Sequence, residues 1–167
     1  MIRVHVDNRA TPGLIRVAAG IRDTRAVNRR LSIALFAWVQ RNFKVGGAMQ
    51  SPPWAPLAAS TKKEKARLGY SSQPLLRTGN LRNSFHSYFD DRLAGVGARA
   101  SYFRGKKGKT PFDYATAHEF GTKKIPARPM LPPEKSARDV AVAMYKDFVA
   151  AASNPKNVAK AIGGGAI

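Results

Sequence analysis

The sequence predicts a single α+β domain, in which a small antiparallel sheet carries two long helices packed on one side. Strand-like runs and amphipathic helical segments are segregated along the chain rather than alternating, which is typical of this class. A chain of 167 residues with 44% hydrophobic composition is also long enough for one core. We expect the domain to cover residues 1–153, with extended loops at 46–58 and 101–112 and a flexible tail at 154–167.

The composition is strongly basic. Twenty-nine Lys and Arg residues against ten Asp and Glu residues give a net charge of +19, which indicates an anionic partner or an acidic neighbouring subunit. A solvated, self-repelling surface explains the same charge equally well. The chain has no cysteine, which excludes disulfides and thiolate chemistry. Its apolar runs stop short of the ~20 residues that span a bilayer, so no membrane partner is expected.

The first part of the chain predicts one strand and two helices. Alternating apolar residues predict a strand at 2–7, and Thr11-Pro12 begins a short helix that ends near Ala19. A long helix over 24–45 follows. Its apolar residues recur at three-to-four spacing, which predicts an amphipathic helix lying on the sheet: Val27, Leu31, Ala34, Leu35, Trp38 and Phe43.

A basic helix is predicted after the first extended loop. That loop is rich in Gly, Pro and Ser and ends near Trp54. Ser60-Thr61 are expected to cap a helix from Lys62 to Leu68, which Gly69 closes. Its exposed cations are candidate contacts for DNA or an acidic partner: Lys62, Lys63 and Lys65.

A brief helix and a hairpin come next. Thr78 is expected to cap a helix that carries Leu81 inward and leaves Arg77 and Arg82 outward. The runs 85–89 and 93–98 flank Asp90-Asp91, a turn pair, and predict a hairpin. The following loop, 101–112, supplies further candidate contacts for DNA or an acidic partner: Arg104, Lys106, Lys107 and Lys109.

The stretch 114–131 combines a short helix, a stop and an extended arm. Asp113 is placed to begin the helix, Gly121 is placed to end it in the left-handed region, and Tyr114 and Phe120 need packing partners because so short a helix is marginal alone. Two prolines then hold Arg128 in an extended arm. We expect Arg128 to lie at a subunit contact or in a structural ion pair, or else to support the His118-Glu119 turn from within its own chain.

The last helix is predicted over 133–152, with Val140, Met144, Phe148 and Ala151 on one face. It is expected to pack beside the 24–45 helix.

Catalytic chemistry is not expected. His118-Glu119 resembles the start of a zinc-protease motif, but the position of the second histidine is Thr122. The chain has three scattered histidines, no clustered carboxylates beyond the turn pair and no Gly-x-Ser-x-Gly elbow. We therefore assign no catalytic, metal or cofactor-binding residue, and no cofactor.

Four pieces in order resemble a known family. They are Trp54-Ala-Pro-Leu57 with Thr61-Lys62, the run Leu75 to Ser84, Val96-Gly97, and Tyr-Ala-x-x-His-Glu-Phe-Gly with Ile-Pro-Ala-Arg-Pro-Met-Leu, which ends at Leu131. This order resembles the virion morphogenesis (tail-completion) family of tailed bacteriophages, of the Mu-like and P2-like kind. The chain departs from the family pattern by an insertion between Ser101 and Phe112.

The resemblance implies a structural virion protein that completes the tail or joins head and tail. It implies a homo-oligomeric ring, with a hexamer as the leading expectation, located at the neck or tail end and assembled in the host cytoplasm. Partners would be neck, connector or tail-tube proteins, and DNA in the channel. Candidate contacts with subunits or neighbours are Trp54, Arg77, Arg82, Arg128 and Met130. The charge alone supports an alternative, a non-enzymatic nucleic-acid-binding protein.

Overall fold

The computed structural model describes residues 24–99 and 111–154, and it confirms the α+β class. The predicted strand 2–7, the helix from Thr11, the loop cations 104–109 and the tail beyond residue 154 lie outside the described residues. The elements, in chain order, are α2 (Arg25–Lys44), α3 (Ala59–Arg67), α4 (Asn80–Ser84), β1 (Phe85–Phe89), β2 (Ala94–Ala98), α5 (Pro111–Phe120) and α6 (Glu134–Ala152).

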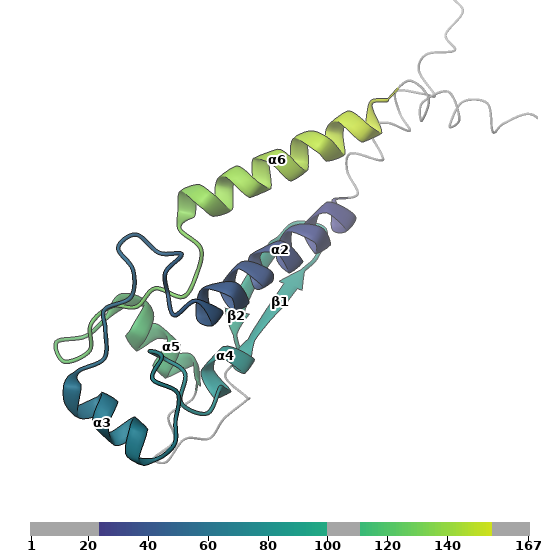
Figure 1. The fold of residues 1–167 in the computed structure, drawn as a ribbon. Helices are drawn as coiled ribbons and strands as arrows, with labels where there is room; N and C mark the ends of the chain where they lie inside the picture. Colours follow the sequence, from purple (N-terminus) through teal and green to yellow (C-terminus); the bar gives the residue numbers. More distant parts are fainter. Residues whose placement is uncertain (1–23, 100–110, 155–167) are drawn as a thin grey trace, which may run out of the picture.

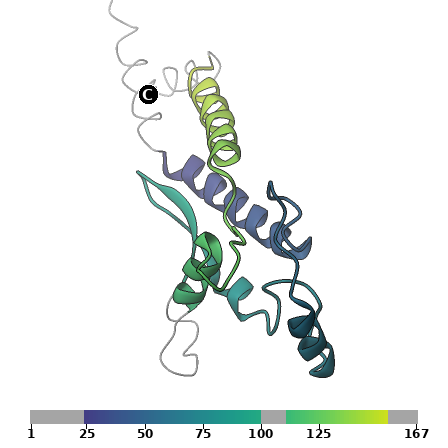
Figure 2. The same cartoon turned by 90° about the vertical axis from the view of Figure 1, so that its left-hand side faces the viewer.

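Helix α2 organises the fold and confirms the prediction of a long amphipathic helix over 24–45. Its buried apolar side chains, Val27, Leu31, Val39 and Phe43, recur at spacings of four and eight residues and therefore form one stripe that winds slowly along the helix. Both strands of the hairpin pack against α2, and α6 packs along it as well. In both Figure 1 and Figure 2, α2 lies between the hairpin and α6. The sheet is therefore covered by α2 directly, and α6 forms a further layer on α2.

The hairpin confirms the prediction of two strands around Asp90-Asp91. Strands β1 and β2 are antiparallel, with a register from Phe85 opposite Ala98 to Phe89 opposite Ala94. The Asp90 carboxylate accepts hydrogen bonds from the main-chain N–H groups of Arg92 and Leu93, at 2.7 and 2.8 Å. These two N–H groups, that of Arg92 first, lower the pKa of Asp90. The turn is thus fixed by its own side chain.

A buried asparagine joins three elements at the hairpin end of α2. The side-chain amide of Asn28 donates to the carbonyl of Asp90 at 2.9 Å, and its oxygen accepts from the hydroxyl of Tyr145 in α6. Thr24 also donates to the carbonyl of Asp91. Asn28 is 1% exposed, so its amide cannot bond to water and needs the hydrogen bonds to Asp90 and Tyr145.

Helix α6 packs beside α2 as predicted, and Met144 and Phe148 lie on its half-buried face as expected, but that face is rotated from the predicted one. Val140 and Ala151, expected on the packed face, are exposed. The half-buried residues are Ala137, Ala141, Met144, Tyr145, Phe148 and Ala152. No residue along α6 is fully buried. The helix therefore leaves apolar side chains uncovered on both flanks of its contact with α2.

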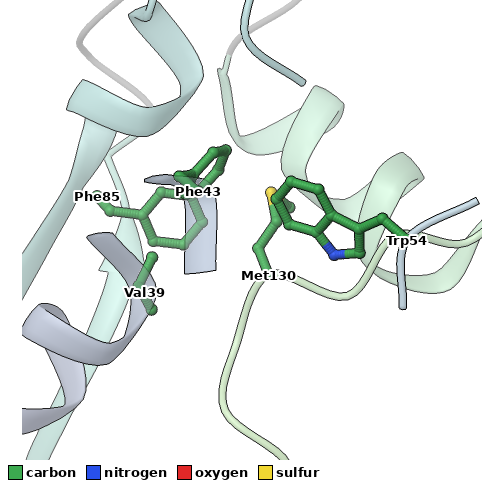
Figure 3. Close-up of a cluster of buried hydrophobic side chains, with 5 residues drawn as sticks. All are labelled: Val39, Phe43, Trp54, Phe85 and Met130. Atoms are coloured by element: carbon green, nitrogen blue, oxygen red, sulfur yellow. The ribbon is translucent and has the colours of Figure 1, made fainter. Parts of the chain in front are cut away.

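The core lies at the carboxyl end of α2, where five side chains from distant segments meet (Figure 3): Val39, Phe43, Trp54, Phe85 and Met130. The rings of Phe43 and Trp54 pack edge to face with centroids 5.4 Å apart. Trp54 and Met130 are 6% and 1% exposed. The sequence analysis expected these two residues to contact a subunit or neighbour. They pack in the core instead, because burying their large apolar side chains removes apolar surface from water.

Three helix starts differ from the predictions. Helix α3 begins at Ala59, with Ala58 at the N-cap and no side-chain cap, so Ser60 and Thr61 lie inside the helix. Gly79, at φ +80°, is the N-cap of α4 in place of Thr78. Helix α5 begins at Pro111, a residue suited to the first turn because its missing N–H needs no partner there. At α3 and α4 the N-cap residue makes no side-chain cap hydrogen bond, so the backbone conformation sets the start.

Gly47 should be far more sensitive to substitution than its neighbour Gly46. Both have positive φ, but a Cβ at Gly47 would lie 2.0 Å from Cγ of Trp54, whereas nothing lies within 4 Å of one at Gly46. G46A should cost about 1 kcal/mol of unfolding free energy for the left-handed backbone, and G47A at least about 2 kcal/mol more because Trp54 must leave its site. Urea unfolding measures the unfolding free energy of both variants. Equal losses would contradict the close contact between position 47 and Trp54.

Candidate functional site

The arm at residues 122–131 is fastened to α5 by its own main chain. The N–H of Arg128 donates to the carbonyl of His118 at 2.6 Å, and the Glu119 carboxylate accepts from the N–H of Met130 at 2.6 Å. Gly121 ends α5 with φ +74°, and a Cβ there would lie 2.9 Å from the nitrogen of Ala127. The chain therefore reverses in a close turn that only glycine fits well.

The loop at 46–58 clasps the arm from the other side. The carbonyl of Pro129 accepts from the indole N–H of Trp54 at 2.5 Å and from the amide of Gln50 at 2.9 Å. Gln50 also donates to the carbonyl of Leu131 at 2.8 Å. Segments more than 70 residues apart in sequence are thus joined by hydrogen bonds to main-chain carbonyls.

Arg128 points inward and bonds to main chain. Its Nε donates to the carbonyl of Ala55 at 2.8 Å and its Nη2 to that of Pro56 at 3.1 Å. Burial lowers its pKa. The expected ion pair is replaced by carbonyl partners, because the 46–58 loop presents two of them where the guanidinium fork reaches. The N–H bond to His118 supports the alternative in which Arg128 holds the turn within its own chain.

Lys65 differs from the expectation of an exposed cation. It is 8% exposed, and its ammonium donates to the carbonyls of Gln73 and Leu76 at 2.7 and 2.9 Å. Burial, and then the charge of Arg77, lower its pKa. Lys65 therefore fastens the 69–79 loop onto α3.

These contacts shape a groove between α3, the 69–79 loop, α4 and α5, which we call the α3–α5 groove. Its cavity volume is about 650 Å³, within the usual range for ligand pockets. The apolar lining is Leu57, Leu68, Tyr70, Leu75, Leu76, Leu81 and Tyr114. The charged and imidazole groups on it are Glu64, Lys65, Arg77, His118 and Arg128. The groove thus has an apolar surface with an excess of positive charge.

The charges in the groove are poorly balanced. Of the described residues that line it, one, Glu64, is acidic. Burial, and then the charge of Arg128, lower the pKa of His118, so its neutral form is favoured. Nδ1 of His118 is buried with no hydrogen-bond partner among the described residues. Arg77 is exposed at the groove, with its guanidinium 4.9 Å from the ring centroid of Tyr70.

The remaining candidates do not gather at the groove. Lys62 and Lys63 are exposed on α3 but do not line it, and neither does Arg82, whose Nε lies 3.4 Å from Oδ1 of Asn83. The groove joins three residues that the sequence singled out: Lys65 for DNA or an acidic partner, and Arg77 and Arg128 for a subunit or neighbour. Sequence reasoning missed its leucines. Their one signal was the adjacent pair Leu75-Leu76, which has the appearance of ordinary core.

Within 24–99 and 111–154, no group of three or more His, Cys, Asp or Glu side chains could hold a metal ion. In the same residues, no helix is long and apolar enough to cross a membrane. Glu119, beside His118 in sequence, uses its carboxylate to accept main-chain N–H groups, and burial raises its pKa against their effect.

Comparison with known proteins identifies one family. The model of the phage virion morphogenesis family matches residues 6–142. No curated protein and no solved structure matches the chain.

Arg128 should be needed for stability. R128A leaves the carbonyls of Ala55 and Pro56 without their donors, and we expect a loss of about 3 kcal/mol in unfolding free energy. R128K should recover part of this, because an ammonium cannot reproduce the fork. R77A, which removes an exposed cation, is the control and should cost at most about 1 kcal/mol. Urea unfolding at constant pH measures the unfolding free energy of R128A, R128K and R77A. Equal losses in R128A and R77A would show that the bonds of Arg128 to the 46–58 loop do not stabilise the fold.

Acid should destabilise the fold through His118. Its folded pKa lies below its ordinary value of about 6.5, so the unfolded state binds more protons between the two values. The stabilisation is complete above about 6.5 and is lost progressively as the pH falls to the folded pKa. Glu119, whose pKa is raised, has the opposite dependence and is present in every variant.

The measurement is therefore a difference. The unfolding free energy of H118Q should change less steeply with pH just below 6.5 than that of the wild type. Identical slopes would show that His118 is not held neutral by the fold.

Proposed function

Because the chain belongs to the phage virion morphogenesis family, we propose that it is a structural subunit that completes the tail or joins head and tail, as one copy in a ring. One observation carries this proposal. Five polar side chains that are buried or half-buried bond to main chain: Gln50, Trp54, Lys65, Glu119 and Arg128. These bonds fix the shape of the loops, which suits a subunit that presents surfaces to other proteins.

The surface available for such contacts includes uncovered apolar side chains on α6. Val142 and Val149 are 47% and 42% exposed and lie one heptad apart on the same flank. Tyr145, between them, is held by its hydroxyl to Asn28 of α2, which fixes the rotation of the helix. A fixed apolar stripe of this kind is a candidate contact between copies.

Phe120 offers a second contact. It is 79% exposed, although the sequence predicted that packing would hold it. Helix α5 packs on the core through Ala115, and Phe120 lies five residues on, about 140° around the helix. Because the adjoining turn is fastened by Arg128 and Glu119, the aromatic ring is presented from a rigid base. Exposed aromatics on rigid elements are typical interface anchors.

The contact between copies is proposed to be head-to-tail, since such contacts close into rings, with a hexamer as the first model to test. Neighbours would be neck, connector or tail-tube proteins. DNA in the channel is a further proposed partner, supported by the net charge of +19 and by exposed Lys62 and Lys63. The same charge supports the alternative function of a nucleic-acid-binding protein, which predicts binding to DNA without assembly.

Assembly should depend on the α6 flank. Native mass spectrometry of the full chain should show a multiple of the monomer mass, and V142E with V149E should reduce it to the monomer with an unchanged melting temperature, because both side chains are already exposed. V140E is the matched control, since Val140 is exposed on the opposite flank of the contact with α2. A wild-type chain that stays monomeric and binds duplex DNA would favour the alternative function.

A further inference from the structure

The α3–α5 groove has walls that are fixed before any partner binds. Lys65 ties Gln73 and Leu76 to α3. Gly69, with φ +69°, ends α3, and Leu75 holds the left-handed conformation at φ 58°, which is unfavourable for a branched side chain and persists only where the surroundings enforce it. Arg128 fixes the opposite wall through the carbonyls of Ala55 and Pro56. Binding there would cost little ordering of the groove itself.

The lining favours a ligand with apolar side chains. Five leucines and two tyrosines face the cavity, and Leu68 and Tyr114 are exposed at its edge. A DNA duplex presents phosphates on a wide, rigid helix and would leave most of this apolar surface uncovered. A peptide segment can place alternate side chains into such a groove.

The charges of the groove favour an acidic ligand. Lys65 uses two of the three N–H bonds of its ammonium on carbonyls, so one remains for a ligand. Arg77 is exposed beside it, and Arg128 is buried without a carboxylate partner among its hydrogen bonds. A carboxylate placed among these three cations would be stabilised by a partly buried field that salt screens weakly.

A second copy of this chain is a poor occupant. The chain carries ten acidic residues against twenty-nine basic ones, so two copies repel each other at a cationic groove. An acidic segment of a different protein complements it.

We propose that the α3–α5 groove binds a short peptide segment, with leucine-like or aromatic side chains next to aspartate or glutamate, from a neighbouring virion protein. The inference rests on the proposed structural role. It adds the chemistry of the partner and the surface that receives it.

The test uses the full chain and a displayed library of random octapeptides. Selection on the wild-type protein should enrich peptides that combine Leu or Phe with Asp or Glu. R77E should weaken binding of the enriched peptides about tenfold, and so should L68S, while a version of each peptide with Asn and Gln in place of the acids should fail to bind. K63E is the matched control, because it makes the same charge change on α3 outside the groove, and it should have little effect.

Three results would overturn the inference: no enrichment, enrichment of peptides without acidic residues, or equal weakening by R77E and K63E. Competition by a duplex DNA oligonucleotide, with R77E and K63E equally impaired, would identify the charge as a DNA surface instead. Native mass spectrometry of the same wild-type sample separates this question from the proposed function. If copies assemble but no peptide is enriched, the proposal of peptide binding in the groove is rejected and the proposed role as a subunit stands.

Discussion

The fold depends on how the carbonyl oxygen of Pro129 is held. The arm at 122–131 contains no helix or strand, so its main-chain groups lack the regular partners that secondary structure supplies. Trp54 and Gln50 provide two donors to the Pro129 carbonyl, and Glu119 provides the acceptor for the next N–H. Met130 follows directly and enters the core at 1% exposed. The position of the arm, of the 46–58 loop and of the end of α5 all follow from this junction.

Hydrogen bonds to main chain substitute here for a large apolar core. Helices α3, α4 and α5 have nine, five and ten residues, lengths at which an isolated helix is marginal. Lys65 joins α3 to its loop, and the main-chain N–H of Arg128 and the carboxylate of Glu119 join the end of α5 to the arm. A buried donor or acceptor that loses its partner costs about 1–3 kcal/mol of folding free energy. Each of these bonds therefore favours the observed loop conformation over conformations in which the bond is broken. Such a network makes the site rigid without making it reactive.

The sequence predicted the secondary-structure elements more accurately than the contacts between them. The period of α2 and the turn residues Asp90-Asp91 are local signals, and both were predicted within one or two residues. Gly121 was predicted in the left-handed region and has φ +74°. The inward course of Lys65 and Arg128 was not predictable, because their partners are carbonyls of other loops that carry no residue-specific signal. Phe120 was misjudged for a related reason: an apolar residue in a short helix predicts burial only when the packed side of that helix is known.

The buried cations also change what the net charge means. Lys65 and Arg128 hold loops together through hydrogen bonds to carbonyls. Burial disfavours the charged form of both side chains and lowers their pKa. Their hydrogen-bond partners are neutral carbonyls, so the fold tolerates charges that are incompletely compensated beside an open groove. An anionic group that enters the groove would compensate them in the folded state alone, because the unfolded chain does not gather these residues. Such a ligand stabilises the protein by an amount that grows with the logarithm of its concentration once that concentration exceeds its Kd. Arrival of a partner would therefore strengthen the same loops that shape its binding surface, and assembly and stability would be coupled through the two cations.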